Sequence, residues 1–259
     1  MSTSFGTTPT FYSQQGEDLL IYRNFINKNV EDGVFLELGA CDGVVYSNTL
    51  FFEQFLGFHG ILIEPVKEMY DRLSMNRPNN FLYNSAISSS VEDIEFLVNG
   101  PVSGALPNMQ NTFIDGWHKH SIRRKMKTKK LSDIFDENDI QYIDLFSLDV
   151  EGSELDVLNT IDWSKVSIYL ICIELDDHNV EKDEQCRKLL RENGFIFKTK
   201  SCINEFWMNP NYERIDKLFD DNKKGSFSGN MNDYGTHRYL EPHCKSIIEK
   251  AISEYENDE

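Results

Sequence analysis

Apolar and polar residues along the chain follow patterns that predict strands and helices in alternation. Five apolar runs suit strands that are buried in a sheet, and helical patterns lie between them. These runs cover residues 34–38, 60–65, 81–87, 144–150 and 167–175. Two further strands, at 195–202 and 204–209, lie so close together that they predict a hairpin rather than another crossover. The pattern indicates an α/β fold with a mostly parallel sheet.

Helices are expected between these strands and before the first of them. A helix from Phe11 would turn four apolar side chains inward, namely Leu19, Tyr22, Phe25 and Ile26. The later helices are expected from Ser47, after Pro65, and at 131–139, 151–158, 181–193 and 241–256. A short strand at 94–98 is followed by a segment, 99–130, that is expected to be irregular, and irregular segments of this length are usually functional or mobile.

The first strand ends in a glycine loop, VFLELGACDG at 34–43. Gly39 and Gly43 let the backbone approach a bound molecule where a Cβ would clash. Their spacing does not match the GxGxxG pattern of dinucleotide-binding proteins. Glu37 lies near the strand end, where it could reach an amine or a hydroxyl group of a ligand. The loop predicts a nucleotide-type site, although a plain turn would also contain these glycines.

Composition narrows the class of protein. The chain has 259 residues, 40% of them hydrophobic, so it can bury the core of one large domain. The net charge of −17 disfavours nucleic acid and anionic membranes as partners over most of the surface. No apolar run is long enough to span a membrane and the first residues lack a signal pattern, so we expect a cytoplasmic protein. The five cysteines show no zinc or disulfide pattern and are expected to be free thiols.

Carboxylates stand where four of the expected strands end. Because the carboxyl ends of parallel strands lie along one edge of a sheet, we expect these side chains to converge. They are Glu37 and Asp42 after the first strand, Glu64 at the second, Asp149 and Glu151 at the fourth, and Glu174, Asp176 and Asp177 at the fifth, with Ser85 and Ala86 at the third. Buried carboxylates in this number indicate a ligand or a metal that compensates their charge.

Six motifs occur in one characteristic order: YSQQGEDLLI, FLELGACDGVVYSNT, ILIEP, NSAISS, KTKKLSDIF and IDLFSLDVEGSELDVL. Together they resemble the FkbM-type S-adenosylmethionine-dependent methyltransferases over residues 11–209. Cys41 departs from the family, which often has Asn at this place. The resemblance implies a Rossmann-like class I methyltransferase fold, with a seven-stranded, mostly parallel sheet, an antiparallel last strand and helices on both faces.

The resemblance also implies where S-adenosylmethionine binds. Glu37 and the backbone of the glycine loop would hold its methionine end, Glu64 its ribose hydroxyls, and Ser85 with Ala86 its adenine. A carboxylate suits the ribose because it can accept hydrogen bonds from two adjacent hydroxyl groups. The full set of expected cofactor-binding residues is Gln14, Glu37, Gly39, Ala40, Asp42, Gly43, Asn48, Thr49, Glu64, Pro65, Ser85, Ala86 and Asp149.

Methyl transfer to a sugar hydroxyl needs a group that takes the hydroxyl proton or a metal that lowers the pKa of the hydroxyl. Glu151 and His178 are alternative bases beside Asp149, and Glu151 could instead cap the helix that follows it. Asp149 and Glu174 resemble in position the magnesium ligands of catechol O-methyltransferase-like enzymes. With Asp176 they form a candidate site for Mg²⁺ or Mn²⁺, which both prefer oxygen ligands.

A basic run interrupts this acidic chain at 116–130, GWHKHSIRRKMKTKK. The run could bind a phosphate-bearing acceptor, with Trp117 stacked on a sugar ring. The expected substrate-binding residues are Trp117, His118, His120, Arg123 and Arg124. A solvated, mobile loop and an RNA-binding surface are the alternative interpretations.

The sequence thus predicts an S-adenosylmethionine-dependent O-methyltransferase that acts on a sugar hydroxyl of a glycan or glycoconjugate, with a divalent metal as a candidate cofactor. An RNA methyltransferase and a catalytically idle binding protein are the alternatives. Residues 1–10 are expected to be a flexible tail, 11–209 the methyltransferase domain, and 210–259 an extension packed on or beside it. The sequence does not indicate the oligomeric state.

Overall fold

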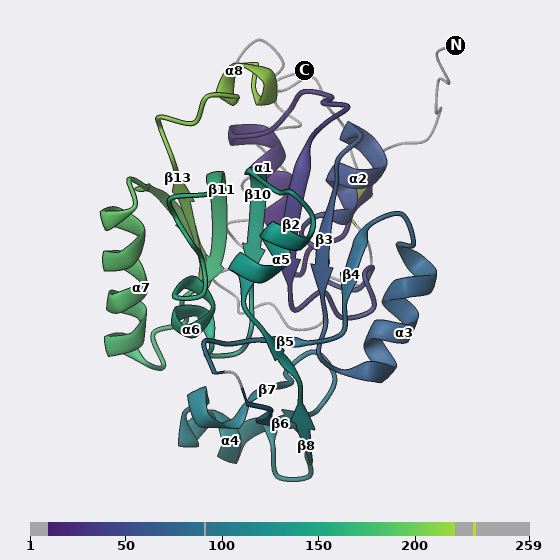
Figure 1. Cartoon of the computed structure of the whole chain (residues 1–259), viewed down its shortest axis with the longest axis vertical. Coiled ribbons are helices and arrows are strands. Elements are labelled where there is room, and N and C mark those ends of the chain that lie inside the picture. The colour runs from purple at the N-terminus through teal and green to yellow at the C-terminus, as the bar shows by residue number, and fades with distance from the viewer. Residues whose placement is uncertain (1–9, 91, 221–229, 232–259) are drawn as a thin grey trace.

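The computed structural model of the chain describes residues 10–90, 92–220 and 230–231. Its main feature is a seven-stranded sheet in the order β12-β13-β11-β10-β2-β3-β4 (Figure 1). The strands are β2 (Val34–Leu38), β3 (His59–Ile63), β4 (Phe81–Tyr83), β10 (Tyr142–Leu148), β11 (Ser167–Glu174), β12 (Ile196–Ser201) and β13 (Asn204–Met208).

All neighbours in this sheet are parallel except those of β13, which is antiparallel to both β11 and β12. β12 and β13 form the hairpin expected at 195–209. The antiparallel strand is therefore the last of the seven along the chain. This topology confirms the predicted class I methyltransferase fold.

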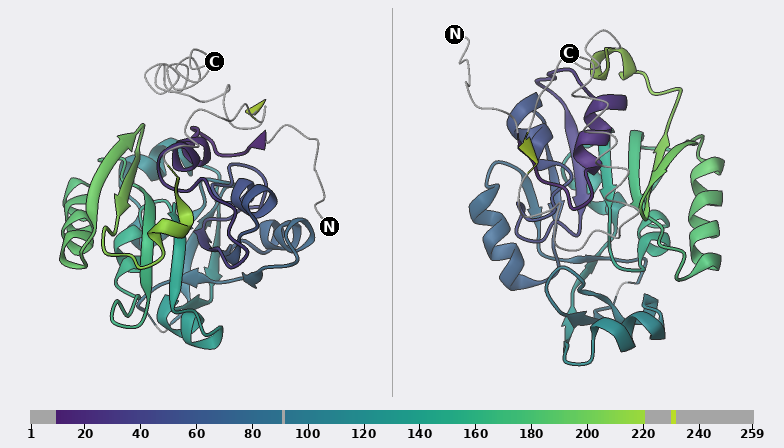
Figure 2. Two further views of the ribbon diagram at one scale, coloured as in Figure 1. Left: turned by 90° about the horizontal axis from the view of Figure 1, so that it is seen from above. Right: turned by 180° about the vertical axis from the view of Figure 1, so that it is seen from behind.

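Helices cover both faces of the sheet (Figure 2). Side chains alternate along β2, so that Leu36 and Leu38 face one core and Phe35 faces the other. The first core packs against α5 (Leu131–Glu137), α6 (Glu154–Leu158) and α7 (Val180–Glu192). The second packs against α1 (Glu17–Asn24), α2 (Leu50–Leu56), α3 (Lys67–Asn76) and α8 (Ile215–Leu218). Two short strands outside the main sheet, β1 (Thr10–Phe11) and β14 (Asn230–Met231), pair with each other.

A second, smaller layer lies beyond the carboxyl ends of the main strands (Figure 1). It contains an antiparallel sheet of β6 (Ile94–Val98), β7 (Gly104–Ala105) and β8 (Ile122–Met126), together with η1 (Leu106–Asn108) and α4 (Asn111–Trp117). The expectation of an irregular segment at 99–130 is therefore wrong. β8 pairs with β6 across a long sequence separation, and only Met126 of its five residues is buried, so β8 has no apolar pattern of its own.

Two other expected elements have different bounds. The strand expected at 81–87 is divided, because the chain leaves the main sheet after Tyr83 and Ala86–Ile87 (β5) pairs with Thr128–Lys129 (β9). The first helix begins at Glu17 rather than Phe11. The carboxylate of Asp18 accepts the N–H groups of Tyr12 and Ser13 and so holds the preceding segment outside the helix.

Further expectations concern the cysteines, the ends of the chain and membrane-spanning helices. Cys41, Cys172 and Cys186 are free thiols, but Cys202 is disulfide-bonded, so the expectation of five free thiols is wrong. The helix expected at 241–256 and residues 1–9 of the expected tail lie outside the described residues. None of the helices in the described ranges combines the length and apolar character needed to cross a membrane.

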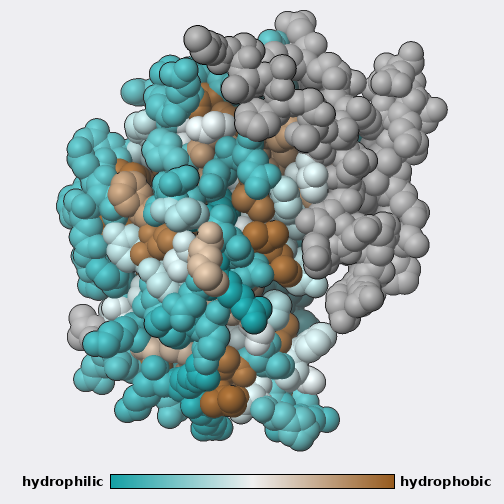
Figure 3. Space-filling view, turned by 90° about the vertical axis from the view of Figure 1, so that its right-hand side faces the viewer, coloured by the Kyte–Doolittle hydropathy of each residue, from teal (hydrophilic) through white to brown (hydrophobic). Residues whose placement is uncertain are grey.

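The surface over α3 and the edge strand β4 is mainly hydrophilic, with isolated apolar side chains (Figure 3). Met75 and Phe81 are exposed on these two elements. Isolated apolar residues are normal on a protein surface.

Candidate active site

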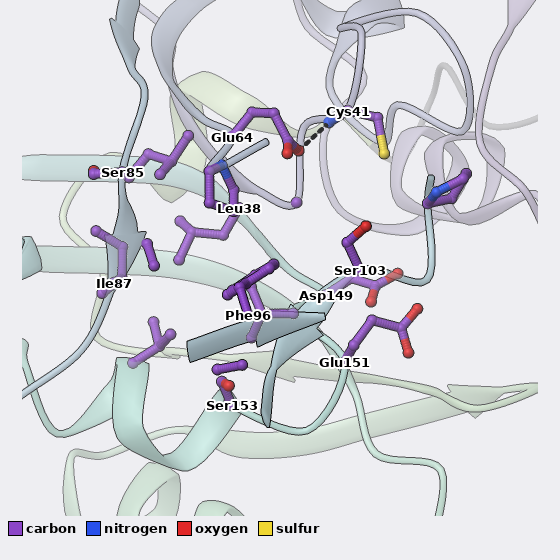
Figure 4. Close-up of a pocket in the computed structure, with 18 of the residues that line it drawn as sticks. Leu38, Cys41, Glu64, Ser85, Ile87, Phe96, Ser103, Asp149, Glu151 and Ser153 are labelled. Carbon is purple, nitrogen blue, oxygen red and sulfur yellow. Dashed lines mark hydrogen bonds between the residues drawn. The ribbon is translucent and has the colours of Figure 1, made fainter. Parts of the chain in front are cut away.

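A cavity lies at the carboxyl edge of β2, β3 and β10, covered by the small layer. We call it the first cavity, and it encloses about 570 Å³ of empty space, part of it open to solvent. Ser85 and Ile87 lie at one end of this cavity and Asp149 and Glu151 at the other (Figure 4). Phe96 of β6 contributes apolar surface between the two ends. The first cavity therefore has an apolar end and an acidic end.

The floor of the cavity requires glycine at position 39. Gly39 has φ +76°, and a Cβ built on it would lie 2.1 Å from the carbonyl oxygen of Asp149. The loops that follow β2 and β10 thus touch through their backbones. Gly104 of β7 is similarly close, since a Cβ there would lie 3.0 Å from the Cβ of Glu151. These contacts bring three elements together around Asp149 and Glu151.

Glu64 lines the first cavity and is 5% exposed. One of its carboxylate oxygens accepts the Cys41 N–H at 3.0 Å (Figure 4). The other accepts the Val66 N–H at 2.7 Å. Each oxygen still has a second lone pair for a ligand. Burial raises the pKa of Glu64 to about 7.

Glu37 has a different environment from the one expected. Its carboxylate is buried and accepts hydrogen bonds from the Ser47 hydroxyl, the Asn48 N–H, the Thr49 hydroxyl and the Arg77 guanidinium. It is not among the residues that line the first cavity. In this structure the Glu37 carboxylate stabilises the loop between β2 and α2 through these hydrogen bonds.

Asp149, Glu151 and Glu174 form a carboxylate cluster in which one oxygen of each residue lies within 4.8 Å of the others. Burial and the neighbouring Asp149 raise the pKa values of Glu151 and Glu174 well above their ordinary range. Carboxylates this close share protons or bind a cation. The cluster differs from the expected metal site in one member, because Glu151 takes the place of Asp176.

A second cavity adjoins the cluster from the other side. It encloses about 390 Å³ of empty space, partly open to solvent. Glu151 lines both cavities, whereas Asp149 lines the first and Glu174 the second. His178 also lines the second cavity, and its Nδ1 forms a hydrogen bond with Asp176. The carboxylate cluster therefore lies at the junction of the two cavities.

The comparison with known families decides the class of protein. Residues 37–197 match the family described as "Methyltransferase FkbM domain", which is more than half of the chain. The chain belongs to the FkbM methyltransferase family. It is therefore an S-adenosylmethionine-dependent methyltransferase by family and by fold. No curated protein sequence matches the chain significantly.

The comparison with solved structures finds methyltransferases at low sequence identity. Fibrillarin from Aeropyrum pernix, in complex with S-adenosyl-L-methionine, is 11% identical with a TM-score of 0.42, and the alignment covers 75% of this chain and 73% of fibrillarin. An O-methyltransferase from Bacillus cereus in complex with SAH is 10% identical with a TM-score of 0.40, over 75% and 78% of the two chains. A TehB-like methyltransferase from Corynebacterium glutamicum is 10% identical with a TM-score of 0.39, over 75% and 87%.

The expected cofactor-binding residues fall into two groups. Gly39, Glu64, Pro65, Ser85, Ala86 and Asp149 line the first cavity. Gln14, Glu37, Ala40, Asp42, Gly43, Asn48 and Thr49 do not. In the second group, the Asp42 carboxylate accepts the N–H groups of Val44 and Val45 and so stabilises the turn at the end of the glycine loop.

The expected substrate residues lie on α4, β8 and the turn between them, and none of them lines either cavity. Arg124 forms an ion pair with Glu68 of α3 at 2.7 Å. His118 is buried, whereas Trp117, His120 and Arg123 are exposed. Their part in acceptor binding remains a prediction.

Sequence reasoning missed several residues of the site. Phe96 and Ser103 line the first cavity, and Asn108 and Phe113 line the second, all from the segment 94–130. Arg77 was missed as well, although it is fully buried and contacts Glu37. An arginine at the end of an exposed helix gives no local signal of burial, because its ion-pair partners lie far away in the sequence.

Proposed function

We propose that the protein is an O-methyltransferase that acts on a sugar hydroxyl of a glycan or glycoconjugate. The observation that carries this proposal is the carboxylate cluster at the junction of the two cavities. A methyl donor in the first cavity and an acceptor in the second would meet at Asp149, Glu151 and Glu174. This arrangement supplies both proximity and a group that can take a proton.

The first cavity would hold S-adenosylmethionine. When bound, the cofactor supplies a methyl group on a positively charged sulfur. The apolar end, with Ile87, and the apolar surface of Phe96 next to it suit the adenine, and the free lone pairs of Glu64 suit the ribose hydroxyls. The acidic end, with Asp149 and Glu151, suits the positive sulfur.

Two residues are candidates for the base that takes the acceptor proton. Glu151 lies between the cavities, but its raised pKa favours the protonated form unless a cation is bound. His178 lines the second cavity and is oriented by Asp176, as a histidine base requires. Asp176 then serves as a positioning residue for His178 rather than as a metal ligand.

The carboxylate cluster also fits a divalent cation. Three carboxylate oxygens that lie within 4.8 Å of one another need only small shifts to coordinate Mg²⁺ or Mn²⁺. Such an ion would neutralise the cluster and lower the pKa of an acceptor hydroxyl. We expect activity to fall strongly after exhaustive chelation and to return with Mg²⁺ or Mn²⁺. Activity that survives chelation would contradict the metal-binding part of the proposal. It would not affect the proposed methyl transfer.

A methyl-transfer assay with labelled S-adenosylmethionine tests the function directly. The panel contains neutral glycans, phosphate-bearing glycans and RNA. We expect transfer to a glycan, and we expect calorimetry to detect binding of S-adenosylhomocysteine that Glu64→Ala weakens. Binding of S-adenosylhomocysteine without methyl transfer to any acceptor would favour the catalytically idle binding protein. No binding at all would contradict the proposal that the protein is a methyltransferase.

RNA remains the second candidate acceptor because of the basic strand β8. Arg123 and Lys125 are exposed on it, and neither forms an ion pair within the described part of the chain. Exposed cations on a strand can contact phosphates. Transfer to RNA, with affinity that falls steeply as salt rises, would replace the glycan proposal.

A further inference from the structure

A polar groove continues the second cavity away from the carboxylate cluster. We call it the outer groove. It encloses about 1310 Å³ of empty space, much of it open to solvent. It shares five lining residues with the second cavity, namely Asn108, Gln110, Gly152, Asn179 and Lys182. The two hollows therefore adjoin along these residues, and the second cavity in turn adjoins the carboxylate cluster.

Amide side chains are prominent along the outer groove. Gln110, Asn159 and Gln185 line it and are exposed. Their side-chain amides form no hydrogen bond with any other described residue. Each amide offers two donors and an acceptor, which matches a surface of sugar hydroxyls that both donate and accept.

Charge in the outer groove excludes anionic ligands. Lys182 is the one cation among the lining residues described, and Glu154 and Asp183 both bind it. The other charged lining residues are the acids Asp156 and Glu181. A phosphate in this groove would meet carboxylates and no available cation. The groove therefore suits an uncharged ligand rather than a nucleotide sugar or a nucleic acid.

The second cavity and the outer groove differ in size. The second cavity, with about 390 Å³ of empty space, is much smaller than the outer groove, with about 1310 Å³ on the same measure. The space beside the carboxylate cluster is therefore limited, and the outer groove offers more room for a ligand that extends away from the cluster.

We propose that the outer groove is a subsite for neutral sugar units next to the unit that is methylated. The preferred acceptor is then an uncharged oligosaccharide rather than a monosaccharide or a nucleotide sugar. This inference rests on the proposed function, because it presumes that the acceptor is a sugar.

The test compares acceptors of different length. The probes are a series of neutral glycans, from single sugars to hexasaccharides, assayed with labelled S-adenosylmethionine and the full chain. We expect kcat/KM to rise with length, chiefly through a lower KM. The double variant N159A/Q185A removes two free amides, each worth a few-fold in binding, and should reduce the preference for oligosaccharide over monosaccharide by roughly tenfold.

Gln141→Ala is the matched control, since Gln141 is an exposed amide that lines none of the first cavity, the second cavity or the outer groove. It should leave the length preference unchanged. Equal transfer to monosaccharides and oligosaccharides, or an unchanged preference in the double variant, would overturn the subsite and leave the proposed function standing. Transfer to no glycan at all would instead overturn the proposed function.

Discussion

Gly39 shows how one residue sets the geometry of the site. Its φ of +76° lies in the left-handed region, and the Asp149 carbonyl occupies the space that a side chain would need. Any other residue would separate the loops after β2 and β10. That separation would move Asp149 away from the floor of the first cavity.

Gly39→Ala should therefore destabilise the fold. The left-handed backbone and the steric clash together are worth at least about 2 kcal/mol of unfolding free energy. Denaturant titration followed by circular dichroism measures the change. Gly116→Ala is the control, because Gly116 lies in α4 and its Cβ would meet nothing within 4 Å. The control should be neutral or slightly stabilising, since alanine favours helix.

Glu64 links cofactor binding to pH. Because burial raises its pKa to about 7, the side chain is largely protonated below neutral pH and ionised above it. Protonation turns one carboxylate oxygen into a hydroxyl group, which is a poor acceptor, so only the ionised side chain accepts well from the ribose hydroxyls at both oxygens. Affinity for S-adenosylhomocysteine should therefore rise up to roughly tenfold between about pH 6 and about pH 8.

Isothermal calorimetry at the two pH values measures this effect. Glu64→Gln should lose most of the dependence, because glutamine does not ionise. Glu68→Gln, which changes an exposed glutamate of α3, should retain it. An equal affinity of the unmodified protein at both pH values would contradict the role given to Glu64.

At the level of elements, Arg77 joins α3 to the glycine loop and to α2. Its guanidinium is fully buried and contacts Glu37 at 3.2 Å and Glu53 at 2.6 Å. It also donates to the hydroxyl groups of Ser47 and Thr49. The segment between β2 and α2 is thus fixed by a charge that α3 provides.

Arg77→Met should remove this support and leave Glu37 buried without its cation. Loss of one partner from a buried ion pair typically costs about 3–5 kcal/mol of unfolding free energy. Arg72→Met is the control on the same helix, since Arg72 is exposed. Denaturant titration of both variants would distinguish the loss of a buried charge from a general effect on α3. Equal stability of the two variants would contradict the role of Arg77.

At the level of the whole molecule, the segment after the hairpin closes the amino end of the sheet. The Tyr212 hydroxyl donates to the buried Asp144 of β10 at 2.6 Å. Leu218 of α8 is fully buried in the second core. The second core therefore includes residues beyond the part that matches the family, which ends at 197.

Leu218→Ala tests whether α8 belongs to the cooperative unit. A buried leucine replaced by alanine typically costs about 2–5 kcal/mol of unfolding free energy. Lys217→Ala, an exposed change on the same helix, should have little effect. If Leu218→Ala leaves the thermal transition unchanged, α8 lies outside the cooperative fold.

Local sequence patterns were sufficient to predict the main sheet and many of the residues that line the first cavity. A buried strand has an apolar run, and a close backbone approach needs glycine, so β2, Gly39 and Glu64 could be identified from their own neighbourhoods. The acids at the ends of β10 and β11 followed from the parallel order of the strands. These features depend on residues near one another in the chain.

The features that local patterns did not predict depend on contacts between distant segments. β8 is a strand because β6 pairs with it, and Arg77 is buried because Glu37 and Glu53 surround it. Glu151 joins the carboxylate cluster, with φ +53° at the turn after β10, whereas Asp176 bonds to His178. Patterns in the sequence were enough to predict the main sheet, the glycine loop and the family. Which carboxylates meet, and that two cavities share them, depends on the packing of distant elements, because that packing sets the distances between the side chains.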